Sequence, residues 1–246
     1  MEERDRQRAI RVRLAGSQAR SVQRISTGFS TLDEALEGGL PRGKITEVAG
    51  DSGAFKSTLA LSIAAAAQSE GLTAAWIDAE HVFDPAYAVR AGVSLERLPV
   101  VRADTAEELL EIARRLCASG GLDLLIIDSA AALTPAIELQ IGLGESGPGL
   151  QTRVLASGFR RLSFIAFKTE TAVLVLNQIR SAGGADAQEV SSAGPTVKLH
   201  SALRILLEPL ESGLRARFRI VKNRYATPVR SGELRFEFRG DSPESL

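Results

Sequence analysis

The feature that most constrains the fold is an apolar run that leads through a glycine-containing turn into a helix-forming run. Residues 45–49 are typical of a short buried strand, and residues 58–68 are rich in Ala and Leu and free of Gly and Pro, as a helix requires. A turn between a strand and a helix N-terminus is a natural phosphate site, because backbone N–H groups and the helix dipole face the ligand. The turn that would do this consists of Gly50, Asp51, Ser52, Gly53, Ala54, Phe55, Lys56 and Ser57.

This turn matches the phosphate-loop pattern G-x-x-x-x-G-K-[ST] at every defined position except one. In that pattern the lysine reaches the β- and γ-phosphates and the hydroxyl that follows it holds Mg²⁺. Here Lys56 and Ser57 are present, but Phe55 replaces the second glycine. Glycine serves where backbone must approach a ligand without a Cβ, so a benzyl group either fills part of the pocket or reshapes the loop. Taken alone, the segment also fits an ordinary turn with a solvated lysine.

The rest of the chain predicts an α/β fold. Short, largely apolar runs at residues 74–77, 122–127 and 173–176 are typical of strands buried on both faces, and helical stretches such as residues 106–117 lie between them. This alternation favours a mostly parallel sheet flanked by helices. After His200, close-set strands at residues 203–207, 214–221 and 233–239 predict an antiparallel extension of the sheet. Residues 181–194 are small, polar and glycine-containing, and we interpret them as a long mobile loop.

Length and composition limit the class of protein. A chain of 246 residues suits one α/β domain, and its formal net charge of zero means that nucleic acid binding must use a local patch. The single cysteine, Cys117, excludes an internal disulfide, and no apolar run approaches the roughly 20 residues of a membrane span. The N-terminus lacks the apolar core of a secretory signal. We therefore expect a cytoplasmic protein without membrane contact.

Residues 1–24 differ from the remainder because arginine dominates them. The acids Glu2, Glu3 and Asp5 are outnumbered by the basic residues Arg4, Arg6, Arg8, Arg11, Arg13, Arg20 and Arg24. We treat this stretch as an N-terminal extension to a core of residues 25–246. A solvated, frayed tail and an arm that docks or contacts DNA remain equally good interpretations.

Polar side chains end three of the predicted strands. Asp128 follows residues 124–127 in the Walker B arrangement, which places a carboxylate near Mg²⁺ at the carboxyl edge of the sheet. Glu80 ends a second strand and could polarise an attacking water. Asn177 and Gln178 end a third, where an amide could sense the γ-phosphate. Acids at strand ends are common, but three such ends at the edge that carries the loop favour a nucleotide site.

Several short sequence motifs, taken together, resemble those of the bacterial RecA recombinase family over most of the chain. The matching runs are Ile25-Ser26-Thr27-Gly28 with Leu32-Asp33, Gly38-Gly39-Leu40-Pro41, Ile77-Asp78-Ala79-Glu80-His81 with Asp84-Pro85 and Tyr87, Ile127-Asp128-Ser129 with Ala132-Leu133-Thr134-Pro135, Asn177-Gln178-Ile179-Arg180, and Val221-Lys222-Asn223-Arg224.

The resemblance implies ATP and Mg²⁺ as ligands and assigns roles by position. Asp84 and Tyr87 correspond to residues that contact and stack on adenine, and the loop with Thr58 would hold the phosphates. Glu80 matches the hydrolytic glutamate, Gln178 the γ-phosphate sensor and Asp128 the Walker B acid, which would share Mg²⁺ with Ser57. Lys222 and Arg224 match two lysines that reach the nucleotide of a neighbouring subunit.

The resemblance also implies binding to single-stranded DNA. Residues 144–150 look like the family's first DNA-binding loop, and residues 180–194, from Arg180 to Gly194, look like the second. Arg153 and Arg160 match basic residues that hold the phosphate backbone, as sequence-independent binding requires. A solvated helix face is the alternative for these two arginines, because they are seven residues apart on one side.

The sequence departs from the family at four places. Besides Phe55, the second loop is shorter and carries Asp186 and Glu189, which should weaken DNA binding. We expect the family's C-terminal domain to be absent, because the chain ends soon after the core strands. The arginine-rich N-terminus does not match the elements that link RecA subunits. These differences argue against a filament with shared active sites.

Two functions follow from these observations. We favour a RecA paralogue reduced to its core, similar to the ImuA type of accessory protein. It would act in the DNA-damage response through partners such as RecA or an error-prone polymerase, with weak DNA contact and impaired nucleotide binding because of Phe55. The alternative is an ATP-dependent recombinase or DNA-dependent ATPase, favoured by Lys56, Glu80, Tyr87, Asp128 and Gln178. A nucleotide-sensing scaffold unconnected with DNA is disfavoured by Arg153 and Arg160.

Overall fold

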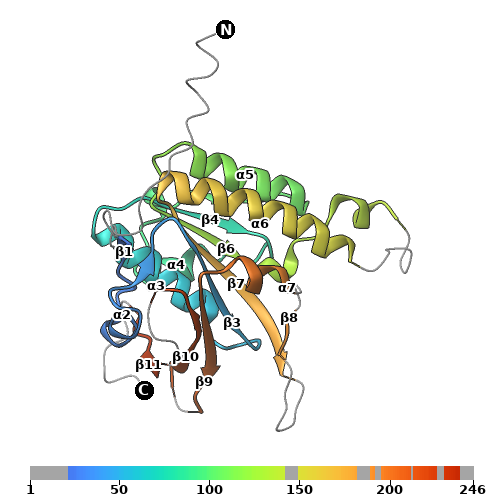
Figure 1. Ribbon diagram of the computed structural model, residues 1–246. Helices are drawn as coiled ribbons and strands as arrows, with labels where there is room; N and C mark the ends of the chain where they lie inside the picture. The colour runs from blue at the N-terminus through green and yellow to red at the C-terminus, as the bar shows by residue number, and fades with distance from the viewer. Residues whose placement is uncertain are drawn as a thin grey trace, which may run out of the picture.

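A central, mostly parallel sheet organises the protein in the computed structural model, which describes residues 22–141, 149–181, 189–191, 195–211, 213–225 and 230–238 (Figure 1). Within these residues the strand order is β11-β10-β9-β3-β7-β6-β4-β5, with β8 paired to β7. The strands of this sheet are β3 (Ile45–Gly50), β4 (Ala74–Asp78), β5 (Val100–Val101), β6 (Leu124–Asp128), β7 (Ala172–Ser181), β8 (Glu189–Ser191), β9 (Leu203–Pro209), β10 (Arg215–Asn223) and β11 (Ser231–Arg235).

Helices cover both faces of this sheet, as the alternating pattern predicts. They are α2 (Ser30–Ala35), α3 (Lys56–Ser69), α4 (Pro85–Arg90), α5 (Ala106–Ala118), α6 (Leu150–Thr169) and α7 (Pro195–His200). Short 3₁₀ turns lie at η2 (Leu95–Arg97), η3 (Ala130–Ala132) and η4 (Ala136–Leu139), and β1 (Arg24–Ile25) pairs with β2 (Leu40–Pro41). Figure 1 shows α5 and α6 side by side on one face, with α3 on the other.

Two apolar cores separate these layers. Alternate residues of the buried strands point to opposite faces, so Val48 and Ile126 join α3 in one core while Ile45 and Ile127 join α5 and α6 in the other. Every residue of β3, β4 and β6 is buried. The predicted α/β class, parallel strands and antiparallel extension are therefore confirmed: β3, β4, β6, β7 and β9 pair in parallel, and β9, β10 and β11 pair antiparallel.

Several predicted boundaries need correction. The strand expected at residues 122–127 begins at Leu124, and the one expected at 173–176 runs on to Ser181. The last strand lies at Ser231–Arg235 rather than at residues 233–239. The segment 181–194, interpreted as a loop, contains β8, whose Val190 pairs with Arg180. Pairing between distant segments decides these bounds, and apolar runs alone do not reveal it.

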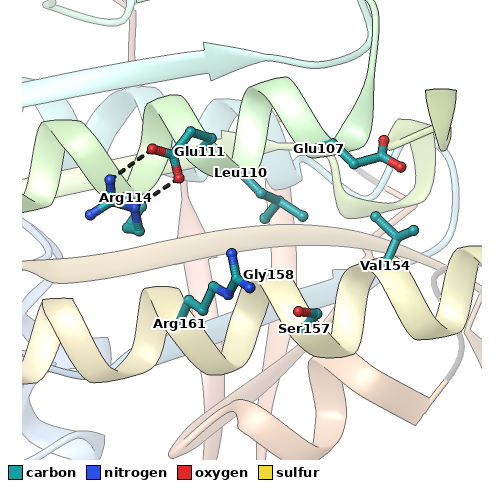
Figure 2. Close-up of a pocket in the computed structure, with 8 residues that line it drawn as sticks. All are labelled: Glu107, Leu110, Glu111, Arg114, Val154, Ser157, Gly158 and Arg161. Carbon is teal, nitrogen blue, oxygen red and sulfur yellow. Dashed lines mark hydrogen bonds and ion pairs between the residues drawn. The ribbon is translucent and has the colours of Figure 1, made fainter.

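The helices α5 and α6 approach closely at one point. A Cβ added to Gly158 of α6 would lie 2.4 Å from Cδ1 of Leu110 on α5, so any larger residue there would force the Leu110 side chain to move. Figure 2 shows the groove beside it, where the Arg161 side chain points from α6 toward α5. On the α5 side, Glu111 is bound by Arg114 and Arg115.

A buried polar cluster crosses the middle of the sheet. Glu47 of β3 is fully buried and accepts a 2.5 Å hydrogen bond from Nε of Arg204 on β9, which is 4% exposed. The side-chain amide of Asn177 on β7 donates to the other Glu47 oxygen at 2.9 Å. Paired charges are the form in which ions are tolerated in a protein interior. The cluster therefore joins the three strands that lie beneath the turn at residues 50–57.

No helix in the described ranges combines the length and the apolar character needed to cross a bilayer.

Candidate functional site

The predicted phosphate loop lies at the carboxyl edge of the parallel strands. Strand β3 ends at Gly50 and α3 begins at Lys56, so the turn between them faces the N-terminus of a 14-residue helix. A Cβ on Gly50 would lie 2.6 Å from the carbonyl oxygen of Leu207, which explains why glycine is required there. Strand pairing sets Gly50 directly opposite Gln178, so the predicted γ-phosphate sensor adjoins the loop.

The Lys56 side chain folds back onto the first residues of the phosphate loop. Its Nζ donates to the carbonyl oxygens of Gly50, at 3.0 Å, and of Asp51, at 2.8 Å. Partial burial lowers the pKa of the Lys56 ammonium, and the nearby carboxylates of Asp128, Glu80 and Asp51 oppose that shift. A desolvated ammonium at a helix N-terminus suits a multiply charged anion, because attraction between charges is stronger where water is excluded.

Ser57 and Asp128 form the pair that the sequence predicted as Mg²⁺ ligands. The Ser57 hydroxyl donates to Oδ2 of Asp128 at 2.7 Å, joining the first turn of α3 to the end of β6. Mg²⁺ in nucleotide sites usually takes only one or two protein oxygens and completes its shell with phosphates and water. The pair fits that chemistry, and in the part of the chain described there is no cluster of three or more His, Cys, Asp or Glu that could hold a metal alone.

Burial raises the pKa of Asp128 to about 6, and the carboxylates of Glu80 and Asp78 add to the rise. The folded protein therefore binds this proton more readily than the unfolded chain does, so ionisation of Asp128 destabilises the fold as the pH rises from about 4 through 6.

We expect Asp128→Asn to stabilise the ligand-free protein at pH 7 by about 1–3 kcal/mol and to have little effect near pH 4, because a shift of one pKa unit corresponds to about 1.4 kcal/mol. Urea unfolding of both proteins at the two pH values measures this. An equal effect at pH 4 and pH 7 would contradict it.

Glu80 is fixed at the same edge by its neighbours. Ser129, next to Asp128, donates a short hydrogen bond to Oε1 of Glu80. Asp78 holds the turn that carries Glu80. Its carboxylate accepts hydrogen bonds from the N–H groups of Val82 and Phe83 and from the guanidinium of Arg102. Lys56, Ser57, Glu80, Asp128 and Gln178 are thus brought to one edge of the sheet, as the sequence predicted.

Phe55 occupies the left-handed region, with φ 58° and ψ 25°, as the N-cap of α3. Glycine adopts this conformation freely, whereas an L side chain pays about 1–2 kcal/mol for it. The Phe55 ring lies against the ring of Phe236, with 5.3 Å between centroids, and Phe236 also contacts Phe29 edge-on at 5.6 Å. The ring therefore packs into the apolar layer on the α3 side, while Asp51, Ser52 and Gly53 remain exposed.

A second aromatic pair includes Tyr87, which the resemblance to the family assigns to adenine stacking. The Tyr87 hydroxyl shares a 2.7 Å hydrogen bond with Thr58 of α3, and its ring meets Phe238 edge-on with 5.1 Å between centroids. The guanidinium of Arg90 lies over the Phe238 ring, 4.9 Å from its centroid. Asp84 caps α4 by accepting from the N–H groups of Ala86 and Tyr87, so its side chain is used in a structural bond.

The sequence reasoning missed Phe236 and Phe238. Their alternation with charged residues after β11 was a usable signal, because residues two apart on an extended chain face the same side. That signal predicted a strand without showing what its apolar side would cover.

Lys222 and Arg224 are not brought to the loop. The register sets Lys222 opposite Arg204, and Arg204 opposite Glu47, three residues before the loop begins. Strand β10 runs antiparallel to β9, so the residues after Lys222 lead away from the phosphate-loop edge. Lys222 donates to the carbonyl of Lys198 in α7 at 2.7 Å, and its pKa is lowered, first by burial and then by Arg224. Any contact with nucleotide would therefore have to be with that of another subunit.

The predicted DNA-binding residues are only partly described. Arg153 and Arg160 are both exposed on α6. Arg160 lies near the end of α7, where it and Lys222 reinforce the effect of burial in lowering the pKa of His200. Three parts of the two loops fall outside the described residues: 144–148 of the first loop, and 182–188 and 192–194 of the second, which include Asp186 and Gly194. The side chains of Arg180 and Glu189 also fall outside them.

Comparison with known proteins agrees with this fold. Residues 2–240 match the family model for the RecA N-terminal domain. The chain is 40% identical over 224 residues to Protein RecA of Herpetosiphon aurantiacus, an alignment that covers 87% of this chain and 63% of that protein. It is 40% identical over 227 residues to Protein RecA of Borreliella burgdorferi, covering 87% and 62%. It is 38% identical over 245 residues to that of Thermus thermophilus, covering 94% and 72%. The chain belongs to the RecA family.

The chain thus spans 62–63% of the length of the first two relatives. The family match begins at residue 2 and so includes the arginine-rich stretch, whose separation from the core remains a prediction.

Proposed function

We propose that this chain is a DNA recombination and repair protein that binds Mg²⁺ and ATP at residues 50–57 and single-stranded DNA along α6. Its membership of the RecA family supports the general role. The observation that carries the nucleotide part is the position of Phe55, whose ring packs on Phe236 instead of standing free beside Lys56. This favours the alternative in which the loop accepts Phe55, over the expectation that the ring blocks the pocket.

The residues at this edge suggest a division of roles. Lys56 would exchange its two carbonyl partners for phosphate oxygens. Mg²⁺, held by Ser57 and Asp128, would neutralise charge on the phosphates. Glu80, oriented by Ser129, would accept a proton from an attacking water, and Gln178 beside Gly50 would contact the terminal phosphate. Tyr87 and Phe238 offer two apolar rings to a base, and one of them would have to move to admit it.

DNA contact would use the exposed face of α6. Arg153 and Arg160 are separated by two helical turns and present two guanidinium groups to a phosphate backbone. The acids of the second loop would weaken this contact, as the sequence suggests.

A second candidate is an accessory protein of the DNA-damage response, with impaired nucleotide binding and with RecA or an error-prone polymerase as its partner. Two observations favour it. Phe55 holds a positive φ that glycine would adopt without strain, and the rings of Tyr87 and Phe238 contact each other where a base would insert.

ATP turnover with and without single-stranded DNA separates the two functions. We expect DNA-stimulated turnover that falls at least 100-fold in Lys56→Ala and Glu80→Gln, because one loses the phosphate cation and the other the base. Glu70→Gln, an exposed change at the end of α3, should leave the rate unchanged. Turnover that is absent in the unaltered protein, or present and equal in all four proteins, would contradict the proposal.

A further inference from the structure

Two exposed phenylalanines stand out on the C-terminal half of α6. Phe164 is 64% exposed and Phe167 is 57% exposed, and they are the aromatic members of the large apolar side chains that the described residues leave exposed. The buried side of the same helix consists of Leu155, Phe159, Leu162 and Ala166, so the core does not need them. Removing a phenylalanine ring from water is favourable, and two such rings left exposed on one helix indicate a surface for a ligand.

A lysine ammonium accompanies each ring. Nζ of Lys168 lies 5.6 Å from the Phe164 centroid. Nζ of Lys44 lies 4.7 Å from the centroid of Phe167 on α6 and 5.9 Å from that of Tyr225, which follows β10, so it is near two rings from separate parts of the chain. These distances are within the range of cation–π attraction. Glu170 follows at the end of the helix and has an interaction of its own. The patch thus combines flat apolar rings with positive charge.

The patch continues the face that carries the proposed DNA-binding arginines. Arg153, Arg160, Phe164 and Lys168 are seven, four and four residues apart, and all are exposed. Residues at that spacing lie along one side of a helix, over a length of about 22 Å at 1.5 Å per residue. Arg161 does not belong to this row, because it points toward α5 (Figure 2).

These features fit a single-stranded nucleic acid better than a peptide or the chain's own N-terminus. Single-strand sites combine a basic track for phosphates with aromatic side chains on which bases stack. The stretch that precedes Val22 contains six arginines against three acids, so it has the same sign of charge as the patch. Val22, the first described residue, lines a hollow with Arg24, Glu37 and Tyr225. The arginine-rich stretch therefore does not complement the charge of the arginines and lysines on this surface.

We propose that Phe164 and Phe167 form a base-stacking platform that extends the single-stranded DNA path beyond Arg153 and Arg160. Phosphates follow the two arginines, and the next bases lie on the two rings, with Lys44 and Lys168 beside them. The proposal deepens the proposed DNA binding and rests on it in part, so the test must separate ionic contacts from stacking.

Fluorescence anisotropy with a labelled oligo-dT provides this test, over a range of salt concentrations. Phe164→Ala with Phe167→Ala should lower the affinity at least fivefold and leave the slope of log K against log salt unchanged, because stacking releases no counterions. Arg153→Ala with Arg160→Ala should lower the affinity and reduce the slope by about 0.7 for each phosphate that is no longer neutralised. Leu95→Ala, which removes an exposed apolar side chain elsewhere, should change neither quantity.

Two further arms identify what the rings contact. An oligonucleotide with a run of abasic sites should bind the unaltered protein and the double phenylalanine variant equally. Phe164→Trp with Phe167→Trp should keep the affinity for oligo-dT, because tryptophan also stacks on bases. Phe164→Leu with Phe167→Leu should lower it, because leucine has no ring. If only the double arginine variant loses affinity, the base-stacking platform is wrong but the proposed DNA binding stands. If neither the arginine variant nor the phenylalanine variant loses affinity, the platform and the proposed DNA binding are both wrong. A phenylalanine variant that changes self-association in sedimentation, with unchanged DNA affinity, would assign the rings to a protein interface instead.

Discussion

Replacing Glu47 with alanine should lower the free energy of unfolding by about 3–5 kcal/mol, because it removes one partner of a buried ion pair. Glu47 is fully buried and holds both Arg204, at 2.5 Å, and the amide of Asn177. For a protein of this size, the change corresponds to a fall in melting temperature of about 6–20 °C. Urea and thermal unfolding, followed by circular dichroism, measure both quantities.

Two further variants show whether burial is the cause. Glu233→Ala breaks the half-exposed pair with Arg215 and should change stability by less than about 1 kcal/mol. Glu47→Leu combined with Arg204→Met removes both charges, and we expect it to be less destabilising than Glu47→Ala alone. If Glu47→Ala were no worse than Glu233→Ala, the buried cluster would not support the sheet beneath the loop.

Phe236→Ala should affect stability and nucleotide binding together. Phe236 is 3% exposed, and loss of a buried phenylalanine costs about 3–5 kcal/mol. The same change removes the surface on which the Phe55 ring rests. Freed from it, the ring can turn over the loop, and we expect the affinity for Mg²⁺ and ATP to fall at least tenfold. Calorimetric titration measures the affinity, and urea unfolding measures the stability.

A double variant separates the two effects. Phe55→Gly in the Phe236→Ala protein should restore the affinity, because no ring remains to enter the pocket, but it should not restore the stability. Phe29→Ala is the matched control, since Phe29 contacts Phe236 on the same cluster; it should reduce stability with little effect on affinity. If the double variant bound no better than Phe236→Ala, the position of the Phe55 ring would not govern binding.

Much of the fold was predictable because its signals are local. The apolar run at residues 45–49, the glycine-containing turn and the Ala-rich run after it predicted β3, the loop and α3 within two residues at each boundary. Parallel strands bring their carboxyl ends to one edge, so Glu80, Asp128 and Gln178 could be grouped from the sequence. The resemblance to the family then supplied the role expected of each residue.

The features that the sequence did not reveal depend on contacts between distant segments. Phe55 and Phe236 are 181 positions apart, and only the fold shows that the Phe55 ring has a place to pack other than the pocket. The pairing of Glu47 with Arg204 also spans most of the chain. The two exposed rings on α6 could not be recognised from the sequence, because sequence patterns do not show which side of a helix remains uncovered.

The most direct test of this account is a calorimetric titration of the unaltered protein with ATP in the presence of Mg²⁺. We predict saturable binding well below millimolar nucleotide, with Phe55→Gly changing the affinity by less than tenfold. If the unaltered protein takes up no nucleotide at millimolar concentration while Phe55→Gly binds it, the aromatic side chain closes the site and the account is wrong.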